Sequence, residues 1–398
     1  MNQMKSKNQW KRLCDESYED FLLRICENKE LIGTWSDVAG ILNSELESNY
    51  TESKYRKDYY RLKNKDFRNL ETDEINIKIR ELEKQRIKLK TEKIEYNKWL
   101  REEARDEMIK DEIVSAINNL KPLKVPDYIK PEFNNKSYLL AFGDCHYGIE
   151  FELKDLFGST INKYSPDIFK ERMWDLLNQL IYLIEKENIK TLEVWEMGDS
   201  LQGILRINSQ LMKLRYGIIE SSILYADFLS EWLNKLSECV YIRFQMVEDS
   251  NHNQLRILNT PKNSFSEENM SKVILTFIKE RLKDNPNIKI IENPTGMNYT
   301  MVGCYNILGI HGEVKDLDKT IDEFSRTYQC HIDYICAGHL HHMITKETGR
   351  DSEALNIRSI VGVDPYGLSL RKTSNAGASL FVFDSVFGKV CDYSLKVN

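Results

Sequence analysis

The residues best suited to chemistry in this sequence are histidines, aspartates and asparagines that stand directly after short apolar runs. The set is Asp144, His146, Asp199, Asn251, His252, His311, His339 and His341. Side chains at i and i+2 of an extended segment point the same way. We therefore expect Asp144 and His146 to approach one ion together. The same rule groups His339 with His341 and turns His342 away.

Imidazole, carboxylate and amide donors together favour a borderline divalent metal such as Mn, Fe or Zn. Sites for Mg or Ca are built from oxygen ligands, and a single tetrahedral zinc needs only four ligands. Two ions about 4 Å apart would accommodate the whole set and clamp both the attacking and the leaving oxygen of a phosphate ester. The residues therefore predict two divalent metal ions, with Mn as the first expectation.

From residue 137 to residue 398 the chain alternates strand and helix patterns. Strands are predicted at 138–142, 191–197, 239–247, 307–310 and 334–337, and helices at 166–188, 221–236 and 267–283. Such alternation is typical of an α/β sandwich, in which ligand-binding residues lie in loops at strand ends. Each candidate ligand follows one of these strands, so the predicted fold would gather them at one edge.

In chain order, the motifs GDCHYG, GDS, SNHN, HGE and GHLHH resemble the signature of calcineurin-like metallophosphoesterases, over about residues 137–345. The resemblance implies a sandwich of two sheets flanked by helices. It further implies the following sites: a first metal on Asp144, His146 and His341, a bridging Asp199, and a second metal on Asn251, His311 and His339. In this family a metal-bound hydroxide attacks phosphorus in line, so the resemblance implies that His252 gives a proton to the leaving oxygen.

The sequence departs from the family pattern at two positions of the third motif. Ser250 stands where the family has glycine, and Asn253 stands where the family has an acid after the catalytic histidine. Because that acid would help to orient or charge the histidine, proton donation by His252 is expected to be weaker here.

Two arginines and one loop lie near the motifs and are further candidates for the site. Arg206 and Arg256 follow the second and third motifs and are predicted to hold a substrate phosphate, with surface salt bridges as the alternative. The turn-rich segment 362–367 is expected to rim the site.

Residues 1–70 are predicted to form three short helices, with Thr34 as the N-cap of the second. The third, at 51–65, carries six cations and two anions, interleaved with Tyr55, Tyr59 and Tyr60. This arrangement resembles a helix-turn-helix DNA-binding module; the alternative is a small bundle with a solvated face. The predicted DNA contacts are Lys54, Arg56, Lys57 and Arg61.

Residues 71–120 contain good helix formers and almost no glycine or proline, which predicts one long helix. Apolar residues follow a 3-4 spacing that Arg86 and Lys93 interrupt. The helix is expected either to form a coiled coil that makes a homodimer or to pack on its own catalytic domain. Three prolines mark a linker at 121–136, before the metallophosphoesterase domain at 137–398.

The charge and composition of the chain limit the functions that it can have. The net charge of −6 means that any contact with DNA must come from a local basic patch. Eight irregularly spaced cysteines form neither a zinc ribbon nor a dense disulfide framework. No apolar run reaches the length of a membrane span, and the polar first ten residues carry no secretory signal. We therefore expect a cytoplasmic protein.

Three functions remain open for the metal centre, because fold and site do not select a substrate. The first is a DNA nuclease or phosphodiesterase near the SbcD/Mre11 branch of the family. The second is a phosphatase or cyclic-nucleotide phosphodiesterase that acts on a small molecule. The third is a non-catalytic DNA-binding regulator with a retained metal site. The order of helical module, helical stalk and phosphoesterase domain also resembles phage-encoded proteins, and no partner ATPase is indicated.

Overall fold

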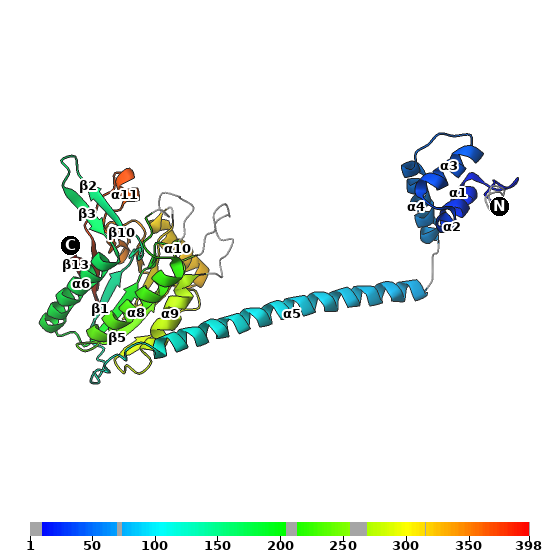
Figure 1. Ribbon diagram of the computed structural model, residues 1–398. Coiled ribbons are helices and arrows are strands. Elements are labelled where there is room, and N and C mark those ends of the chain that lie inside the picture. The colour runs from blue at the N-terminus through cyan, green and yellow to red at the C-terminus, as the bar shows by residue number, and fades with distance from the viewer. Residues whose placement is uncertain (1–9, 70–73, 204–212, 255–268, 315, 398) are drawn as a thin grey trace. The chain divides into compact units, whose positions relative to one another are not determined.

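The computed structural model describes residues 10–69, 74–203, 213–254, 269–314 and 316–397 (Figure 1). It divides into two compact units, residues 1–103 and 104–398. None of the described helices is long and apolar enough to cross a membrane.

The N-terminal unit begins with a bundle of four helices around a small core. They are α1 (Tyr18–Glu27), α2 (Lys29–Ile32), α3 (Trp35–Glu45) and α4 (Glu52–Asn69). Thr34 caps α3 as predicted, because its hydroxyl accepts the amide of Asp37 while the Asp37 carboxylate accepts the amide of Thr34. The short α2 was not predicted.

The tyrosines of α4 are mainly core residues and are not interleaved with its cations on the surface. Tyr55 and Tyr59 are buried in the core of the bundle, and only Tyr60 is exposed. The hydroxyl of Tyr55 donates to Asn43 at 2.8 Å, which ties α4 to α3. Helical periodicity explains the difference, because residues four apart share one face of a helix.

The predicted long helix is present as α5 (Glu74–Asn118). Its described side chains from residue 80 to residue 97 are all exposed, including Leu82, Leu89 and Tyr96. Near its end, Ile113 and Ile117 join the main core of the C-terminal unit.

Two sheets form the centre of the C-terminal unit. The six-stranded sheet has the order β13-β12-β1-β4-β5-β6, and the five-stranded sheet has the order β10-β11-β9-β8-β7. The first contains β1 (Lys136–Phe142), β4 (Thr191–Glu196), β5 (Tyr241–Met246), β6 (Ile288–Ile290), β12 (Gly377–Asp384) and β13 (Gly388–Lys396). The second contains β7 (Asn298–Val302), β8 (Tyr305–Ile310), β9 (Tyr334–Ala337), β10 (Ile344–Gly349) and β11 (Ser352–Asn356). A separate hairpin is formed by β2 (Phe151–Lys154) and β3 (Thr160–Tyr164).

Helices cover the outer faces of this pair of sheets. They are α6 (Pro166–Glu187), α8 (Ile218–Leu236), α9 (Met270–Arg281) and α10 (Leu317–Tyr328), whereas the short α11 (Pro365–Ser369) has no buried residue. Leu140 and Phe142 of β1 pack with α6, α8 and α9, whereas Leu139 and Ala141 pack with the second sheet. Such alternation follows from the pleat of a strand. Ile321 of α10 covers the far side of the second sheet.

The predicted α/β sandwich with two sheets flanked by helices and an all-α N-terminal region is therefore confirmed. The boundaries of the predicted elements differ at several ends. The strand predicted to begin at residue 239 begins at Tyr241, and the helix predicted at 221–236 begins at Ile218. The helix predicted at 267–283 spans Met270–Arg281, with residues 255–268 outside the described part.

Candidate metal centre

The candidate ligands lie in loops that leave the same edge of both sheets. Phe142, Glu196 and Met246 are paired across β1, β4 and β5, so the three loops that follow start at one level. Ile310 and Ala337 are likewise paired at the ends of the parallel strands β8 and β9. This register brings together residues that are up to about 200 positions apart in sequence.

The ligands converge through left-handed backbone and not through extended segments. Five of the ten described non-glycine residues with positive φ are predicted ligands: Asp144 (49°), His146 (43°), Asp199 (51°), His339 (65°) and His341 (58°). The i, i+2 rule therefore assumed the wrong backbone: Asp144 and His146 do share a cluster, as that rule expected, but His339 and His341 lie in different clusters. Hydrogen bonds hold this uncommon conformation, since Asp144 N donates to Gly198 O and His146 N to Asp199 O, both at 3.0 Å. Clusters of such conformations are typical of functional sites.

The first ligand group consists of Asp144, His146 and His341, as the resemblance implied. The Nε2 atoms of His146 and His341 lie 3.2 Å apart, and Asp144 Oδ1 lies 3.4 Å from His341 Nε2. Asp144 and His146 are buried. The other oxygen of Asp144 accepts the amide of His339 at 2.9 Å, which fixes the carboxylate.

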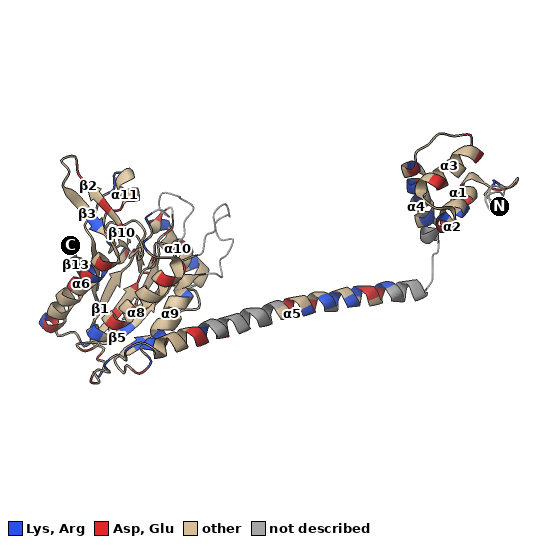
Figure 2. Cartoon of the chain, viewed as in Figure 1, with Lys and Arg blue, Asp and Glu red and all other residues tan. Residues whose placement is uncertain are grey.

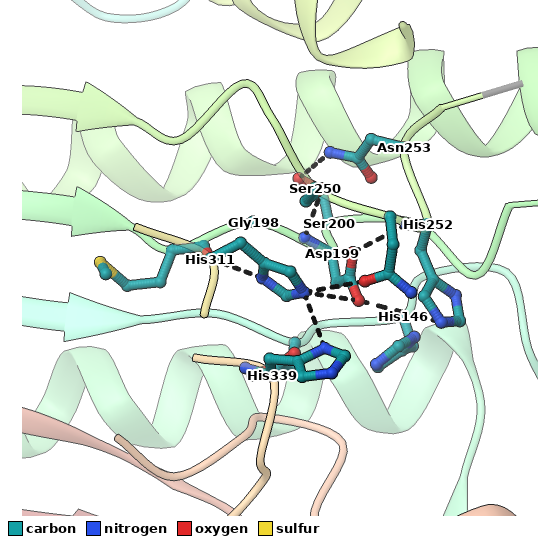
Figure 3. A network of polar contacts seen from close by, with 12 residues as sticks. His146, Gly198, Asp199, Ser200, Ser250, His252, Asn253, His311 and His339 are labelled. Carbon is teal, nitrogen blue, oxygen red and sulfur yellow. Dashed lines mark hydrogen bonds and ion pairs between the residues drawn. The ribbon is translucent and has the colours of Figure 1, made fainter. Parts of the chain in front are cut away.

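The second group contains Asp199, His311 and His339, and Asn251 joins it (Figure 3). His311 Nε2 lies 3.0 Å from Asp199 Oδ2, 3.0 Å from Asn251 Oδ1 and 3.3 Å from His339 Nδ1. The opposite nitrogen, His311 Nδ1, donates to Met197 O at 3.0 Å. That bond leaves Nε2 as the ligand nitrogen, a common arrangement at metal sites.

His252 lies between the two groups, beside Asp199. Its Nε2 is 3.8 Å from Asp199 Oδ2, and its ring meets the ring of His146 edge-on at 4.4 Å. Its Nδ1 donates to the backbone oxygen of Gln202 at 2.8 Å. This bond holds the ring and directs Nε2 toward the ligands.

The residues fit a pair of divalent ions. In each group the donor atoms lie within 4.8 Å of one another, which agrees with metal–ligand distances of about 2.0–2.2 Å. Asp144 Oδ1 is buried and has no hydrogen-bond partner among the described residues, as expected of an atom that binds a cation. Burial and neighbouring imidazoles lower the pKa of His146 well below its usual value, so the ring is neutral and available as a ligand.

The carboxylates of both groups are ionised. Burial alone would raise the pKa of Asp199, but His311 and His252 hold it well below its usual value. The pKa of Asp144 is lowered for the same reason, chiefly by His341. Two buried carboxylates in one cavity are a strong attraction for cations.

The two departures from the family pattern have structural partners. Ser250 Oγ accepts the amide of Asp199 at 3.0 Å. Asn253 is fully buried, and its described hydrogen bonds go to Leu201, Ser200 and Ser271. The contact that orients the His252 ring comes from Gln202 O, whereas the described bonds of Asn253 go elsewhere. Weaker proton donation by His252 stays a prediction.

The remaining predictions from the sequence concern two arginines, His342 and the segment 362–367. Arg206 and Arg256 lie outside the described residues. His342 Nδ1 donates to Leu340 O at 2.6 Å, and His342 belongs to neither ligand group. Just before the segment 362–367, the amide of Val361 donates to Asp144 O, so this part of the chain runs along the first ligand loop.

Sequence reasoning missed Glu196, a fully buried acid at the end of β4. Its carboxylate accepts the amide of Gly198 at 3.1 Å and the hydroxyl of Ser200 at 3.0 Å. The signal available in the sequence was a charged residue within the apolar run that precedes the second motif. Burial raises the pKa of Glu196 to about 8.

The protonation of Glu196 predicts a pH dependence of stability. Folded protein keeps a proton that the unfolded chain loses above about pH 4.5. The contribution of the Glu196 carboxyl to the free energy of unfolding is therefore fully present below that pH and is lost as the pH rises through about 8. We expect the urea midpoint of metal-free protein to fall more between pH 6 and pH 8.5 in the wild type than in Glu196→Gln. Equal pH slopes in the two proteins would contradict this assignment.

Comparisons with known proteins cover the whole chain. Residues 6–73 match the model of the YonJ N-terminal domain, and residues 78–120 match that of the YonJ coiled-coil domain. Similar solved structures include wild-type Vps29 with zinc from Entamoeba histolytica (14% identity, 66% of this chain and 99% of that chain, TM-score 0.29). A dimetal phosphatase from Danio rerio is also similar (10% identity, 66% and 99%, TM-score 0.31).

A curated relative extends over nearly the full length of both chains. This is the "SPbeta prophage-derived uncharacterized protein YonJ" of Bacillus subtilis (strain 168), which is 30% identical over 406 residues. The alignment covers 98% of this chain and 99% of the relative. With matches to the N-terminal and coiled-coil models and this full-length relationship, the chain belongs to the YonJ family.

Proposed function

We propose that this chain is a metal-dependent phosphodiesterase that cleaves DNA. The observation that carries the proposal is the pair of ligand groups around Asp199, with His252 beside both. Two divalent ions, when bound there, would stabilise the charge of a phosphate ester as Lewis acids and generate a nucleophile at neutral pH. Mn is the ion we expect first from the mixed nitrogen and oxygen donors.

The chain's own residues supply the remaining chemistry. Asp199 carries the negative charge shared by both groups, Asn251 supplies an amide oxygen, and the histidines supply imidazole nitrogens. Gln202 O holds His252 in the orientation in which Nε2 faces the site. From that position a protonated His252 would donate to the leaving oxygen as phosphorus–oxygen cleavage proceeds, the usual role of a general acid.

DNA is proposed as the substrate because of α4. Lys54, Arg56 and Lys57 are exposed, as is Arg61, and Figure 2 shows the cations on this helix. The whole chain is acidic, so these residues form a local basic surface of the kind that binds phosphates. The bundle would thus act as the helix-turn-helix-like module predicted above. A nuclease related to the SbcD/Mre11 branch and encoded by a phage is the corresponding proposal for biological class. The prophage-derived relative supports the phage origin alone.

A homodimer through α5 is part of the proposal. Leu82, Leu89 and Tyr96 are seven residues apart and more than half exposed, which is the spacing of a coiled-coil seam. A second copy of the same helix would cover this seam. Sedimentation velocity should show a dimer for the wild type and a monomer for the double variant Leu82→Ser and Leu89→Ser; monomeric wild type would refute the dimer.

The experiment measures hydrolysis of labelled single- and double-stranded DNA, and of bis-p-nitrophenyl phosphate, with added Mn. We expect Mn-dependent cleavage of both kinds of substrate. A variant with glutamine at the four α4 cations should bind DNA less tightly. The slope of log affinity against log salt concentration should become shallower by about three to four, because each phosphate contact contributes about 0.9 to that slope. Hydrolysis of the small diester should stay unchanged.

A matched control removes the same charge from lysines that already have acidic partners. Glutamine replaces Lys235, Lys279, Lys283 and Lys319 in this control. An equal loss of DNA affinity in both variants would contradict a role for α4. Cleavage of the small diester alone would favour the small-molecule phosphodiesterase. No turnover with metal bound would favour the non-catalytic regulator.

A further inference from the structure

The two departures from the family motif meet at one junction of the metal centre. Residues 197–203, the β4 loop, carry Asp199, and residues 247–254, the β5 loop, carry His252. Ser250 and Asn253 of the β5 loop both hydrogen-bond to the β4 loop (Figure 3). The two backbones approach closely at this junction, because a Cβ on Gly203 would overlap the carbonyl of His252.

The hydrogen-bond directions at Asn253 are fully determined. Its Oδ1 faces the amide of Leu201 at 3.1 Å, and an amide nitrogen can only donate. Its Nδ2 lies 3.1 Å from Ser200 Oγ and 2.9 Å from Ser271 Oγ. Both N–H groups of the side-chain amide are therefore used, and its orientation follows from its partners.

Neither serine can donate a proton to residue 253. Ser200 donates its hydroxyl hydrogen to Glu196 Oε1 at 3.0 Å. Ser271, in the first turn of α9, donates its own to Glu248 O at 3.0 Å. Each hydroxyl carries one hydrogen, so both serine oxygens present only lone pairs. The site requires a group with two N–H donors and one acceptor.

We propose that Asn253 is a positioning residue that locks the β4 loop to the β5 loop and to α9. We call Asn253, Ser200, Ser271 and the amide of Leu201 the amide clamp. The residues next to the clamp in sequence make the contacts that matter for the site. His252 N donates to Asp199 Oδ1 at 2.9 Å, and Gln202 O accepts from His252 Nδ1. The amide clamp thus sets the spacing of Asp199 and His252, and this inference rests on the proposed phosphodiesterase function.

The amide clamp is a poor environment for the acid that the family pattern has at position 253. An aspartate at position 253 has nearly the same shape as asparagine, but one of its oxygens would face two serine lone pairs in a fully buried place. A buried charge without donors is strongly unfavourable. Restoring the family's acid should therefore damage this centre instead of improving proton donation by His252.

The test compares Asn253→Asp with a matched change away from the metal centre. Asn285 is also buried and uses the same pattern of bonds. Its Oδ1 accepts the amide of Asn287, and its Nδ2 donates to Asn234 Oδ1 and Ser237 Oγ. Ser237 in turn donates to Asn234 O. Asn285→Asp therefore reproduces the local electrostatic damage without touching either ligand loop.

The measurements are Mn affinity by calorimetry, the absorption spectrum of the Co-substituted protein, and kcat and KM on bis-p-nitrophenyl phosphate. Loss of an outer hydrogen-bond partner of a metal site lowers affinity or activity by about 10–100-fold. We expect Asn253→Asp to lose this much in both Mn affinity and kcat and to alter the Co spectrum. Asn285→Asp should lower the melting temperature with Mn affinity and kcat within about twofold of wild type. Ser271→Ala, which leaves one N–H of Asn253 without its acceptor, should shift the same readouts in the same direction by less.

The outcomes separate the amide clamp from the proposed function. Equal metal affinity in the two aspartate variants, or a rise in kcat for Asn253→Asp, would overturn the clamp. If Asn253→Asp does not fold, an unchanged Mn affinity and Co spectrum in Ser271→Ala would overturn it. If wild type binds Mn but hydrolyses no phosphodiester, the proposed function fails, while Mn affinity and the Co spectrum still decide the clamp.

Discussion

Replacing His252 with alanine should lower kcat for DNA cleavage by about 10²–10⁴-fold, the usual contribution of a general acid. The ring lies beside both ligand groups, and Gln202 O directs its Nε2 toward them. His252 belongs to neither predicted ligand set, so the variant should retain its bound metal. Metal content and cleavage of labelled DNA, measured on the same preparation, check both parts.

The leaving group separates proton donation from other roles of His252. An alkoxide leaving from DNA needs a proton, whereas p-nitrophenolate leaves readily without one. The loss of kcat in His252→Ala should therefore be much smaller on bis-p-nitrophenyl phosphate than on DNA. His331→Ala is the matched control, because His331 is exposed and its near neighbour is Asp333, at 3.3 Å. Equal losses on both substrates would show that His252 supports the site without donating a proton.

The second large effect is expected at Asp199. Replacing it with asparagine keeps its shape but removes the charge that lies 3.0 Å from His311 Nε2 and within reach of His252. Both ligand groups are expected to depend on this carboxylate, because it lies in one described cluster with His146 of the first group and in another with His311 and His339 of the second. We expect wild type to bind two equivalents of Mn and Asp199→Asn fewer than one, with hydrolysis at background level.

Thermal stability gives an independent readout of the same change. A ligand present at 100 times its Kd stabilises the folded state by about 2.7 kcal/mol, so Mn should raise the melting temperature of wild type but not of Asp199→Asn. Asp333→Asn is a suitable control, because Asp333 is also buried, accepts the amide of Asn306 and has a histidine beside it. Two bound equivalents and an undiminished Mn-dependent shift in Asp199→Asn would contradict the bridging role.

The sequence alone was sufficient to predict the sandwich and to name acids and histidines that the structure brings together as potential ligands. Both depend on local patterns: alternating or continuous apolar runs predict strands, and the polar motif that follows each run is contiguous with it. Asp144 with His146, and His339 with His341, were found because each pair is encoded within three residues. The order of five such motifs then implied which residues share an ion. The structure brings the acids and histidines of each implied set close together, and their binding of metal stays a prediction.

Other properties depended on contacts between segments far apart in the chain. Left-handed backbone at Asp144 and His146 is held by hydrogen bonds from the loop after β1 to the loop after β4, which no local pattern encodes. Likewise, Tyr55 and Tyr59 are buried because α1 and α3 pack against one face of α4. Periodicity can group residues on a face, but only packing decides which face is covered.

Asn253 shows most clearly the difference between what the sequence determines and what the tertiary structure decides. Sequence comparison with the family pattern identifies it as a missing acid beside His252. In the folded chain its partners are Ser200 and Leu201, about 50 residues earlier, and Ser271, 18 residues later. The motif therefore determined which residues stand at the centre, and the tertiary structure decided what each contacts. The physical reason is that side-chain chemistry is local to the sequence, whereas hydrogen-bond partners are set by strand register and by the packing of distant loops.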